Sequence, residues 1–324
     1  MNCTLEKAAK LLCENDNFIF LCHIRPDGDT VGSAYALKYA LEAVGKRAIV
    51  MCADEIPARL RFITELSGAN EPIPDVVGHF ICTIDVAETH LLGSNSSFEG
   101  SIDLKIDHHE NGAEYGEYNY IDGKAAACGE IIFKLIRRLE EMRGGVLTPE
   151  ACTALYAAIS SDTGCFRYSN VKSETLRIAA ELIDGGAEAY DVNHRLFEQK
   201  SLAELKARRF MLNNTEYYAN GRVAILVITN AFRQESGAGD DDIGGLVSEM
   251  RETEGVDLAV TLKQDKAQPS LFKISMRSSL NVSASKLCRE FGGGGHERAA
   301  GAAINAESPE AAKNAVLACI LKEF

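Results

Sequence analysis

The sequence predicts an α/β protein with a larger N-terminal domain, built on a mainly parallel sheet flanked by helices, and a smaller C-terminal α+β domain. Three observations predict this fold. Short apolar runs alternate with helical patterns through residues 1–190. The pattern changes after residue 215, where strands surround a few helices. The chain has 324 residues, which is too long for one typical small domain.

Four apolar runs of the first domain are predicted strands, at residues 18–22, 47–52, 80–84 and 102–106. Residues 31–44 have helical spacing, and Gly45 closes this helix. Two further helices are expected at residues 125–143 and 149–160. The second begins at Thr148-Pro149, because threonine caps a helix and proline suits its first turn.

Residues 190–214 are rich in charge and are predicted to form one long helix that connects the domains. After it, strands are expected at residues 217–218, 223–229, 258–262 and 272–276. Helices are expected at residues 243–252 and 283–291, and a last one follows Pro309. We therefore expect domains at residues 1–190 and 216–324, with a connecting helix at residues 191–215.

Composition excludes several classes of function. The net charge of −13 is unfavourable for binding long duplex nucleic acid, which needs a broad basic surface. No apolar run approaches the ~18 residues of a membrane-spanning helix, and the N-terminus lacks a signal pattern. The ten cysteines are scattered without a C-x-x-C pair, which is typical of reduced, buried thiols. We expect a cytoplasmic protein whose substrate is small and phosphorylated.

Residues that bind metals or protons follow most of the predicted strands of the first domain. The list in chain order is His23, Asp27 and Asp29 after residues 18–22, Asp85 after residues 80–84, and Asp107, His108 and His109 after residues 102–106. Asp162 ends a predicted helix and is a fourth contributor. Ligands bind beyond the carboxyl ends of parallel strands, so these side chains should converge at one edge.

Such a set suits two-metal hydrolysis of a phosphate ester. Two divalent ions about 3.5–4 Å apart can hold the attacking and leaving oxygens, and Asp and His ligands suit Mn²⁺ or Mg²⁺. Each residue also has an ordinary interpretation, since Asp caps helices and Asp-Gly makes turns. The recurrence of such residues at successive strand ends favours the metal site.

These residues resemble the motifs of a known family. Residues 23–29, 84–85, 107–109 and 161–164 are similar to the four motifs of the DHH phosphoesterases, in the same order. Residues 291–301, FGGGGHERAAG, resemble the signature of the associated DHHA1 domain. The resemblance spans residues 18–303. In size and layout the chain most resembles one branch of this family. That branch contains the bifunctional oligoribonucleases (nano-RNases) and pAp phosphatases, together with soluble phosphodiesterases of cyclic-dinucleotide pathways.

The resemblance implies a role for each motif residue. His23 and Asp27 would hold one metal ion, Asp29, His108 and Asp162 the other, and Asp85 would bridge them. Asp107 would orient a neighbouring imidazole. His109 would lie near the scissile phosphate and stabilise charge or protonate the leaving group. A metal-activated hydroxide would be the nucleophile, with Mn²⁺ the expected cofactor and Mg²⁺ or another divalent ion the alternative.

The second domain is expected to bind the substrate away from the metals. Glycines let backbone N–H groups approach a phosphate or a base closely. The resemblance assigns this role to the glycine-rich loop and to Arg277; the loop glycines are Gly293, Gly294 and Gly295. His296 and, less strongly, Ser279 are further substrate contacts, and Arg167 of the first domain is another. A flexible turn is the ordinary interpretation of the glycines.

We therefore expect a phosphoesterase that acts on oligoribonucleotides of two to about five nucleotides, on pApA and on pAp. The alternatives are a cyclic-dinucleotide phosphodiesterase, an inorganic pyrophosphatase, a single-strand exonuclease and a nucleotide-sensing binding protein. The GGGGH run disfavours the pyrophosphatase. All six expected ligands are present, which disfavours the sensor. A homodimer is expected from base rates alone.

Overall fold

The computed structural model describes residues 1–66, 78–110, 112–279 and 281–324. The chain divides into two compact units, residues 1–199 and residues 200–324. The predicted fold class is confirmed: the first unit holds a five-stranded parallel sheet between helical layers, and the second holds a mixed sheet. All ten cysteines are free thiols, and five of them are buried.

The sheet of the first unit has the strand order β2-β1-β3-β4-β5 and is parallel throughout. Its strands are β1 Phe18–Leu21, β2 Ala48–Met51, β3 Phe80–Ile84, β4 Leu104–Asp107 and β5 Tyr118–Ile121. Four of the five correspond to predicted strands. The fifth, with the sequence YNYI, was missed, although aromatic and β-branched residues are typical of strands.

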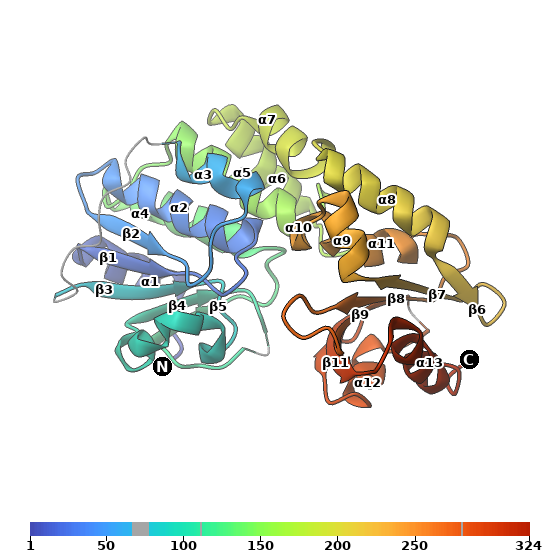
Figure 1. The fold of residues 1–324 in the computed structure, drawn as a ribbon. Helices are drawn as coiled ribbons and strands as arrows, with labels where there is room; N and C mark the ends of the chain where they lie inside the picture. Colours follow the sequence, from blue (N-terminus) through green and yellow to red (C-terminus); the bar gives the residue numbers. More distant parts are fainter. Residues whose placement is uncertain (67–77, 111, 280) are drawn as a thin grey trace. The chain divides into compact units, whose positions relative to one another are not determined.

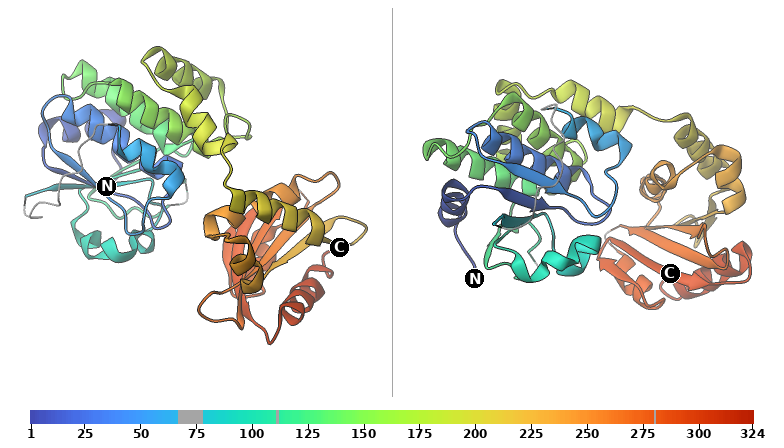
Figure 2. Two further views of the ribbon diagram at one scale, coloured as in Figure 1. Left: turned by 45° about the horizontal axis from the view of Figure 1, so that its top comes forward. Right: turned by 60° about the vertical axis from the view of Figure 1, so that its left-hand side comes forward.

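The helices of the first unit are α1 Leu5–Glu14, α2 Gly28–Glu42, α3 Arg61–Thr64, α4 Cys128–Glu141, α5 Pro149–Asp162, α6 Ser173–Asp184 and α7 Ala189–Asn193. Short helices of other types are η1 Ala58–Leu60, η2 Thr89–Ser101 and η3 His194–Glu198. Figures 1 and 2 show α2, α4 and α5 over one face of the sheet, and η2 (teal) beyond the other face.

Alternating side chains of β1 fill both layers of this core. Phe18 and Phe20 pack with the helices, whereas Ile19 and Leu21 belong to a smaller cluster that includes Leu92 of η2. This alternation follows from the two-residue period of a strand. Because both faces of the sheet are covered, its polar chemistry is confined to the strand ends.

The predicted single helix over residues 190–214 is wrong. The chain forms α7, then the π-helical turn η3, and starts again as α8 Leu202–Asn214. Gln199 is extended, and the Ser201 side chain accepts a hydrogen bond from the backbone N–H of Glu204. This cap begins a new helix, and the boundary between the two units falls between residues 199 and 200.

The second unit has a sheet with the order β10-β11-β9-β8-β7-β6, in which only β7 and β8 pair in parallel. Its strands are β6 Glu216–Tyr218, β7 Val223–Ile228, β8 Leu258–Gln264, β9 Leu271–Ser278, β10 Gly294–His296 and β11 Ala299–Asn305. Its helices after α8 are α9 Asn230–Ser236, α10 Asp240–Gly244, α11 Leu246–Arg251, α12 Ala284–Arg289 and α13 Pro309–Ile320. The predicted helix 243–252 is thus divided at Gly245.

Among the described residues, no helix has the length and apolar character needed to cross a membrane.

Candidate metal centre at the strand ends

Side chains that follow β1, β3 and β4 meet the end of α5 at one edge of the first sheet. Three groups of possible ligands lie there, and within each group the ligand atoms are within 4.8 Å of one another. The groups are His23, Asp27 and Asp85; Asp29, His108 and Asp162; and Asp85, His108 and His109. The structure thus brings together all six predicted ligands, with Asp85 and His108 each in two groups.

Asp85 lies at the centre of this cluster. Its Oδ2 is 3.7 Å from His23 Nε2, and its Oδ1 is 3.4 Å from His108 Nε2. Only 3% of its side chain is exposed, and among the described residues Oδ1 has no hydrogen-bond partner. A buried carboxylate oxygen without a donor is costly, so a cation is the partner that this position fits.

The loop after β1 is held in place by helix α2. Asp27 is the N-cap of this helix, and its Oδ1 accepts hydrogen bonds from the backbone N–H groups of Asp29 and Thr30. The Thr30 hydroxyl donates to the carbonyl of Ile84 at 2.8 Å, which links this loop to the end of β3. His23 and Asp27 are therefore fixed beside Asp85 by backbone geometry.

Asp29, in the first turn of α2, is fully buried against the start of α4. Its Oδ2 accepts from the Cys128 N–H at 2.6 Å, and its Oδ1 accepts from the Gly129 N–H at 2.9 Å and the Ser33 hydroxyl at 3.1 Å. The first N–H groups of a helix lack intrahelical partners and favour a negative charge. Helix α4 thus stabilises this carboxylate 3.8 Å from His108 Nε2.

His23 has the tautomer that a metal ligand needs. Its Nδ1 lies 2.8 Å from the carbonyl of Ile24, which can only accept, so Nδ1 carries the proton. Nε2 then faces Asp27 and Asp85, each 3.7 Å away, and offers its lone pair once a cation displaces its proton. A backbone carbonyl is a common partner for fixing a metal-binding imidazole in this way.

Burial and the neighbouring charged groups shift the pKa values of this cluster. Burial and then the charge of Asp85 raise the pKa of Asp162 to about 7. Burial and the charges of Asp85 and Asp162 raise the pKa of Asp29 well above its usual range. Burial opposes the charged form of His23, yet hydrogen bonds to Asp27 and Asp85 outweigh it and raise its pKa to about 11. The cluster therefore holds protons that a divalent cation would displace.

His109 differs from the other imidazoles. Its Nδ1 lies 2.7 Å from Asp107 Oδ1, and 3.6 Å from Asp85 Oδ1. In the third group, Nδ1 of His109 would be the ligand atom. The shorter contact, however, indicates that Nδ1 carries a proton and donates a hydrogen bond to Asp107 Oδ1. This hydrogen bond raises the pKa of His109, and together with the charges of His109 and Lys105 it lowers the pKa of Asp107 despite burial. His109 Nδ1 is therefore less suited to binding a cation than the ligand atoms of the other two groups.

Most of the predicted substrate residues of the second unit lie on β9 and β10, the two strands that flank β11. In the sheet, Ala299 of β11 pairs with Arg277 of β9 on one side and with His296 of β10 on the other. The side chain of His296 lies outside the part of the chain that the structure describes. Ser279 donates to Asp257 at 2.8 Å, so its hydroxyl already has a structural partner.

The glycines of the run 292–295 have different environments. A side chain on Gly293 would collide with the carbonyl of Gly301 and would lie 2.5 Å from Ala302 Cβ. Gly295 has a φ of 138°, which other residues rarely adopt. A Cβ atom added to Gly294 would meet nothing within 4 Å among the described residues. Of Gly293, Gly294 and Gly295, Gly294 is therefore the one with open space beside it.

Arg167 belongs to the first unit. Its Nε donates to the carbonyl of Gly164 at 2.7 Å, in the turn that follows Asp162. The side chain is exposed and lies outside the three ligand groups.

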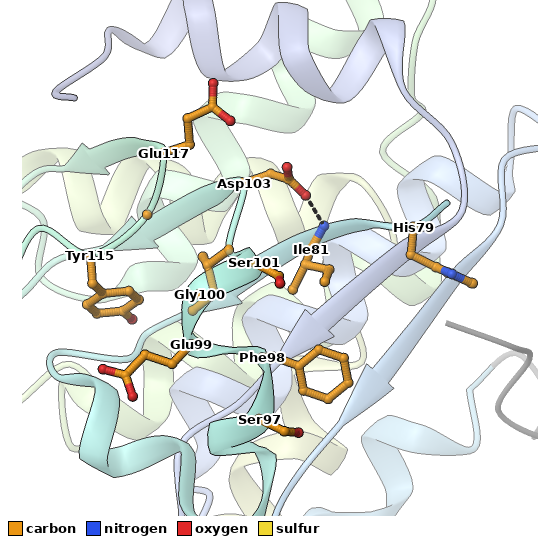
Figure 3. Close-up of a pocket in the computed structure, with 12 residues that line it drawn as sticks. His79, Ile81, Ser97, Phe98, Glu99, Gly100, Ser101, Asp103, Tyr115 and Glu117 are labelled. Carbon is orange, nitrogen blue, oxygen red and sulfur yellow. Dashed lines mark hydrogen bonds between the residues drawn. The ribbon is translucent and has the colours of Figure 1, made fainter. Parts of the chain in front are cut away.

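A separate cavity of about 860 Å³ lies at the other ends of β3 and β4 (Figure 3). His79 precedes β3 and Asp103 precedes β4, whereas the ligand groups follow these strands. None of its twelve lining residues is a predicted site residue. The strand-end cluster, where the reactive groups converge, is therefore the candidate site.

Comparisons with known proteins find matches to both units of the chain. A model of the DHH family, N-terminal domain, matches residues 17–159, and a model of the DHHA1 domain matches residues 220–322. The bifunctional oligoribonuclease and PAP phosphatase NrnA of Thermus thermophilus is 31% identical over 305 residues, covering 93% of this chain and 88% of that protein. The protein of the same name from Bacillus subtilis is 27% identical and covers 89% and 90%.

A crystal structure of an exopolyphosphatase-related protein from Bacteroides fragilis has the same fold, with a TM-score of 0.84 and 21% identity. The likeness covers 98% of this chain and 96% of that one. Fold, site and family matches together define a phosphoesterase, a hydrolase of phosphate esters. The chain belongs to the DHH family and carries a DHHA1 domain after the DHH domain.

Proposed function

We propose that this protein hydrolyses short phosphodiesters and 3′-phosphorylated nucleotides: oligoribonucleotides of two to about five nucleotides, pApA and pAp. One observation carries the proposal, namely that three groups of carboxylates and imidazoles overlap at Asp85 and His108. The relatives named oligoribonuclease and PAP phosphatase, which align with most of this chain, support the substrate class. The proposed setting is the cytoplasm, with a homodimer as the proposed assembly.

The strand-end residues fit two divalent cations. His23 and Asp27 would hold one, Asp29, His108 and Asp162 the other, and Asp85 would serve both. Oxygen and imidazole donors without thiolates favour Mn²⁺ over structural zinc. When bound, such ions supply Lewis acidity toward the phosphoryl oxygens and make water acidic enough to act as a nucleophile.

The protein's own side chains would then do three things. Asp29, fixed by the start of α4, and Asp27, fixed by the start of α2, hold the ligand shell rigid. Asp107 orients His109 through the 2.7 Å contact to Nδ1. His109 presents Nε2 to the scissile ester and protonates the leaving oxygen, a role worth typically 10²–10⁴-fold in rate.

The second unit is proposed to select nucleotides. Arg277 and the strand β10, with Gly294 open beside it, would bind the end of the substrate that does not react. Replacing Arg277 by alanine removes a charge-assisted hydrogen bond of about 1.5–3 kcal/mol, so KM should rise about 10- to 100-fold. The Kd for Mn²⁺ should stay the same. The exposed Lys322→Ala variant is the control, and an unchanged KM for Arg277→Ala would remove Arg277 from the binding surface.

Hydrolysis of a substrate panel with Mn²⁺ tests the proposal: pApA, a 5-mer RNA, a 24-mer RNA, pAp, cyclic di-AMP and pyrophosphate. Fast turnover of pApA, the 5-mer and pAp, with little on the 24-mer, is the expected result. Turnover of cyclic di-AMP alone would make the protein a cyclic-dinucleotide phosphodiesterase. Pyrophosphate as the one substrate would contradict nucleotide selection by the second unit. Tight binding of nucleotides without turnover would make the protein a sensor.

A further inference from the structure

A lysine lies in the core directly behind the candidate site. Lys105, in the middle of β4, has no exposed surface and is among the largest fully buried side chains. A buried charge is tolerated only when it is paired and hydrogen-bonded. Lys105 meets this condition, because Nζ donates to the carbonyls of Ala87 at 3.0 Å and Ala113 at 2.8 Å and lies 3.0 Å from Asp107 Oδ2.

Lys105 and Asp107 are two residues apart on one strand, so they point to the same side of the sheet. Their neighbours Leu104 and Ile106 point into the helical core instead. A lysine between apolar residues in LKID is the one sequence signal of this arrangement, and it lies outside the family motifs.

The two oxygens of Asp107 have different partners. Oδ2 faces Lys105, whereas Oδ1 lies 2.7 Å from His109 Nδ1 and accepts from the His109 backbone N–H at 3.2 Å. The Asp107 carboxylate therefore links the Lys105 ammonium group to the His109 imidazole. Rotation of this carboxylate would break the contact of Oδ2 with Lys105 and that of Oδ1 with His109 at the same time.

Neighbouring groups pack closely against this ion pair. The ring of Tyr115 lies 4.7 Å from Lys105 Nζ. A side chain on Gly112 would come within 2.9 Å of Nζ and 3.2 Å of Asp107 Oδ2, so the backbone itself closes that side. Ala87, whose carbonyl binds Nζ, is two residues after Asp85, which ties the pair to the loop of the central carboxylate.

We propose that Lys105 is a positioning residue for leaving-group protonation: through Asp107 it fixes the ring of His109 with Nε2 toward the substrate. The inference rests on the proposed function. An oxygen of water forms the new bond to phosphorus, and the bond from phosphorus to the alcohol oxygen breaks with its electron pair on that oxygen. His109 Nε2 gives this oxygen its proton and later recovers one from solvent, which also takes the proton lost by the water.

The test is a leaving-group comparison on Lys105→Met, which removes the charge at nearly constant length. With pApA, whose ribose leaving group needs a proton, kcat should fall about 10- to 100-fold, the loss typical of an orienting partner. With thymidine 5′-(p-nitrophenyl phosphate), whose leaving group is stable as an anion, kcat should fall less than about threefold. The KM values and the Kd for Mn²⁺ should not change.

Lys38→Met is the matched control, because Lys38 also donates to a backbone carbonyl and pairs with a carboxylate, that of Glu42, within the same unit. It should lower kcat equally little for both substrates. If Lys105→Met lowers kcat by the same factor for both substrates, Lys105 supports the fold alone and the inference is wrong. An unchanged kcat for pApA would overturn it as well.

Lys105→Met leaves Asp107 charged in the core and can fail to fold. The double variant Lys105→Met/Asp107→Asn removes both charges, which is tolerated far better than removing one. It should show the same contrast between the two esters, and equal losses there would also overturn the inference. The wild-type protein separates this outcome from failure of the proposed function, since a wild type inactive on both esters would contradict the function itself.

Discussion

At the scale of single residues, Asp85 combines burial, charge and an uncommon backbone. Its φ is 61°, in the left-handed region that Asp and Asn enter more readily than most other residues. This backbone turns the side chain back into the cluster directly after β3. Strained residues of this kind gather at functional sites because the surrounding fold has to hold them.

Asp85→Asn separates the ligand role of Asp85 from its structural role. Asparagine tolerates the same backbone and removes one like charge, so the free energy of unfolding without metal should not fall. Activity with Mn²⁺ should drop at least about 10³-fold, because several kcal/mol of charge stabilisation depend on the cations. Kinetics and urea unfolding check both parts.

The control for this prediction is Asp103→Asn. Asp103 accepts a hydrogen bond from the Ile81 N–H at the other end of the same strands, so that variant should keep more than about half of the activity. Full activity in Asp85→Asn would contradict a metal centre built on Asp85.

The raised pKa values predict that Mn²⁺ affinity depends on pH. A ligand must lose its proton to bind a cation, and the pKa of Asp162 is about 7 while that of His23 is about 11. Affinity should therefore increase with pH between 6 and 8.5, and more steeply below about pH 7, where Asp162 also holds a proton. Each proton that the cation displaces makes the affinity for Mn²⁺ increase about tenfold per pH unit.

Titration calorimetry in buffers of different ionisation enthalpy would count the protons released in this range. A Kd that is the same at pH 6 and pH 8.5 would show that the carboxylates and His23 are not the ligands.

At the scale of secondary-structure elements, helices α2 and α5 bring the proposed ligands together by close packing. A side chain on Gly28 would lie 2.5 Å from both Cβ and Oγ of Ser161. Gly28 lies between Asp27 and Asp29, and Ser161 precedes Asp162. The contact therefore joins two ligand-bearing segments that are far apart in the sequence.

Gly28→Ala should weaken both the fold and the metal centre. Alanine normally stabilises a helix by about 0.5–1 kcal/mol relative to glycine, but overpacking costs about 1–3 kcal/mol. The clash should prevail, so that the free energy of unfolding falls and the Kd for Mn²⁺ rises. Chemical denaturation and calorimetry measure the two effects. Gly100→Ala, at a position where a new Cβ would meet nothing within 4 Å in the described part of the chain, should neither lower the free energy of unfolding nor raise the Kd for Mn²⁺. A more stable Gly28→Ala variant with unchanged metal affinity would contradict the packing model.

At the scale of the whole molecule, the two units have separate hydrophobic cores. Among the described residues, the last fully buried member of the clusters of the first unit is Val192, and the first of those of the second unit is Ala207. All the proposed metal ligands lie in the first unit. Metal binding should therefore stabilise one unit directly.

Mn²⁺ at about 100 times its Kd should stabilise the first unit by about 2.7 kcal/mol. Hydrogen exchange followed by mass spectrometry should show slower exchange in peptides from residues 1–199 and unchanged exchange in peptides from residues 200–324. Asp85→Asn should abolish the effect. Equal protection of both units would mean that metal binding couples them.

Much of the site could be predicted from the sequence because its residues follow apolar runs. The runs before His23, Asp85 and Asp107 predicted strands, and parallel strands bring their carboxyl ends to one edge, where the structure indeed brings the six predicted ligands together. Conversely, the predicted helix over residues 190–214 failed because helical spacing alone does not register a cap such as Ser201.

The sequence by itself determined many local features of this protein: most of its strands, several of its helices and the motif residues of the DHH family. These depend on neighbours a few positions apart, which a linear pattern records. The tertiary structure alone decided that α4 stabilises Asp29, that Asp85 Oδ1 has no donor among the residues the structure describes, and that Lys105 holds Asp107. Asp29 and the backbone N–H of Cys128 are 99 positions apart, and such contacts exist only because the chain has closed its core around them.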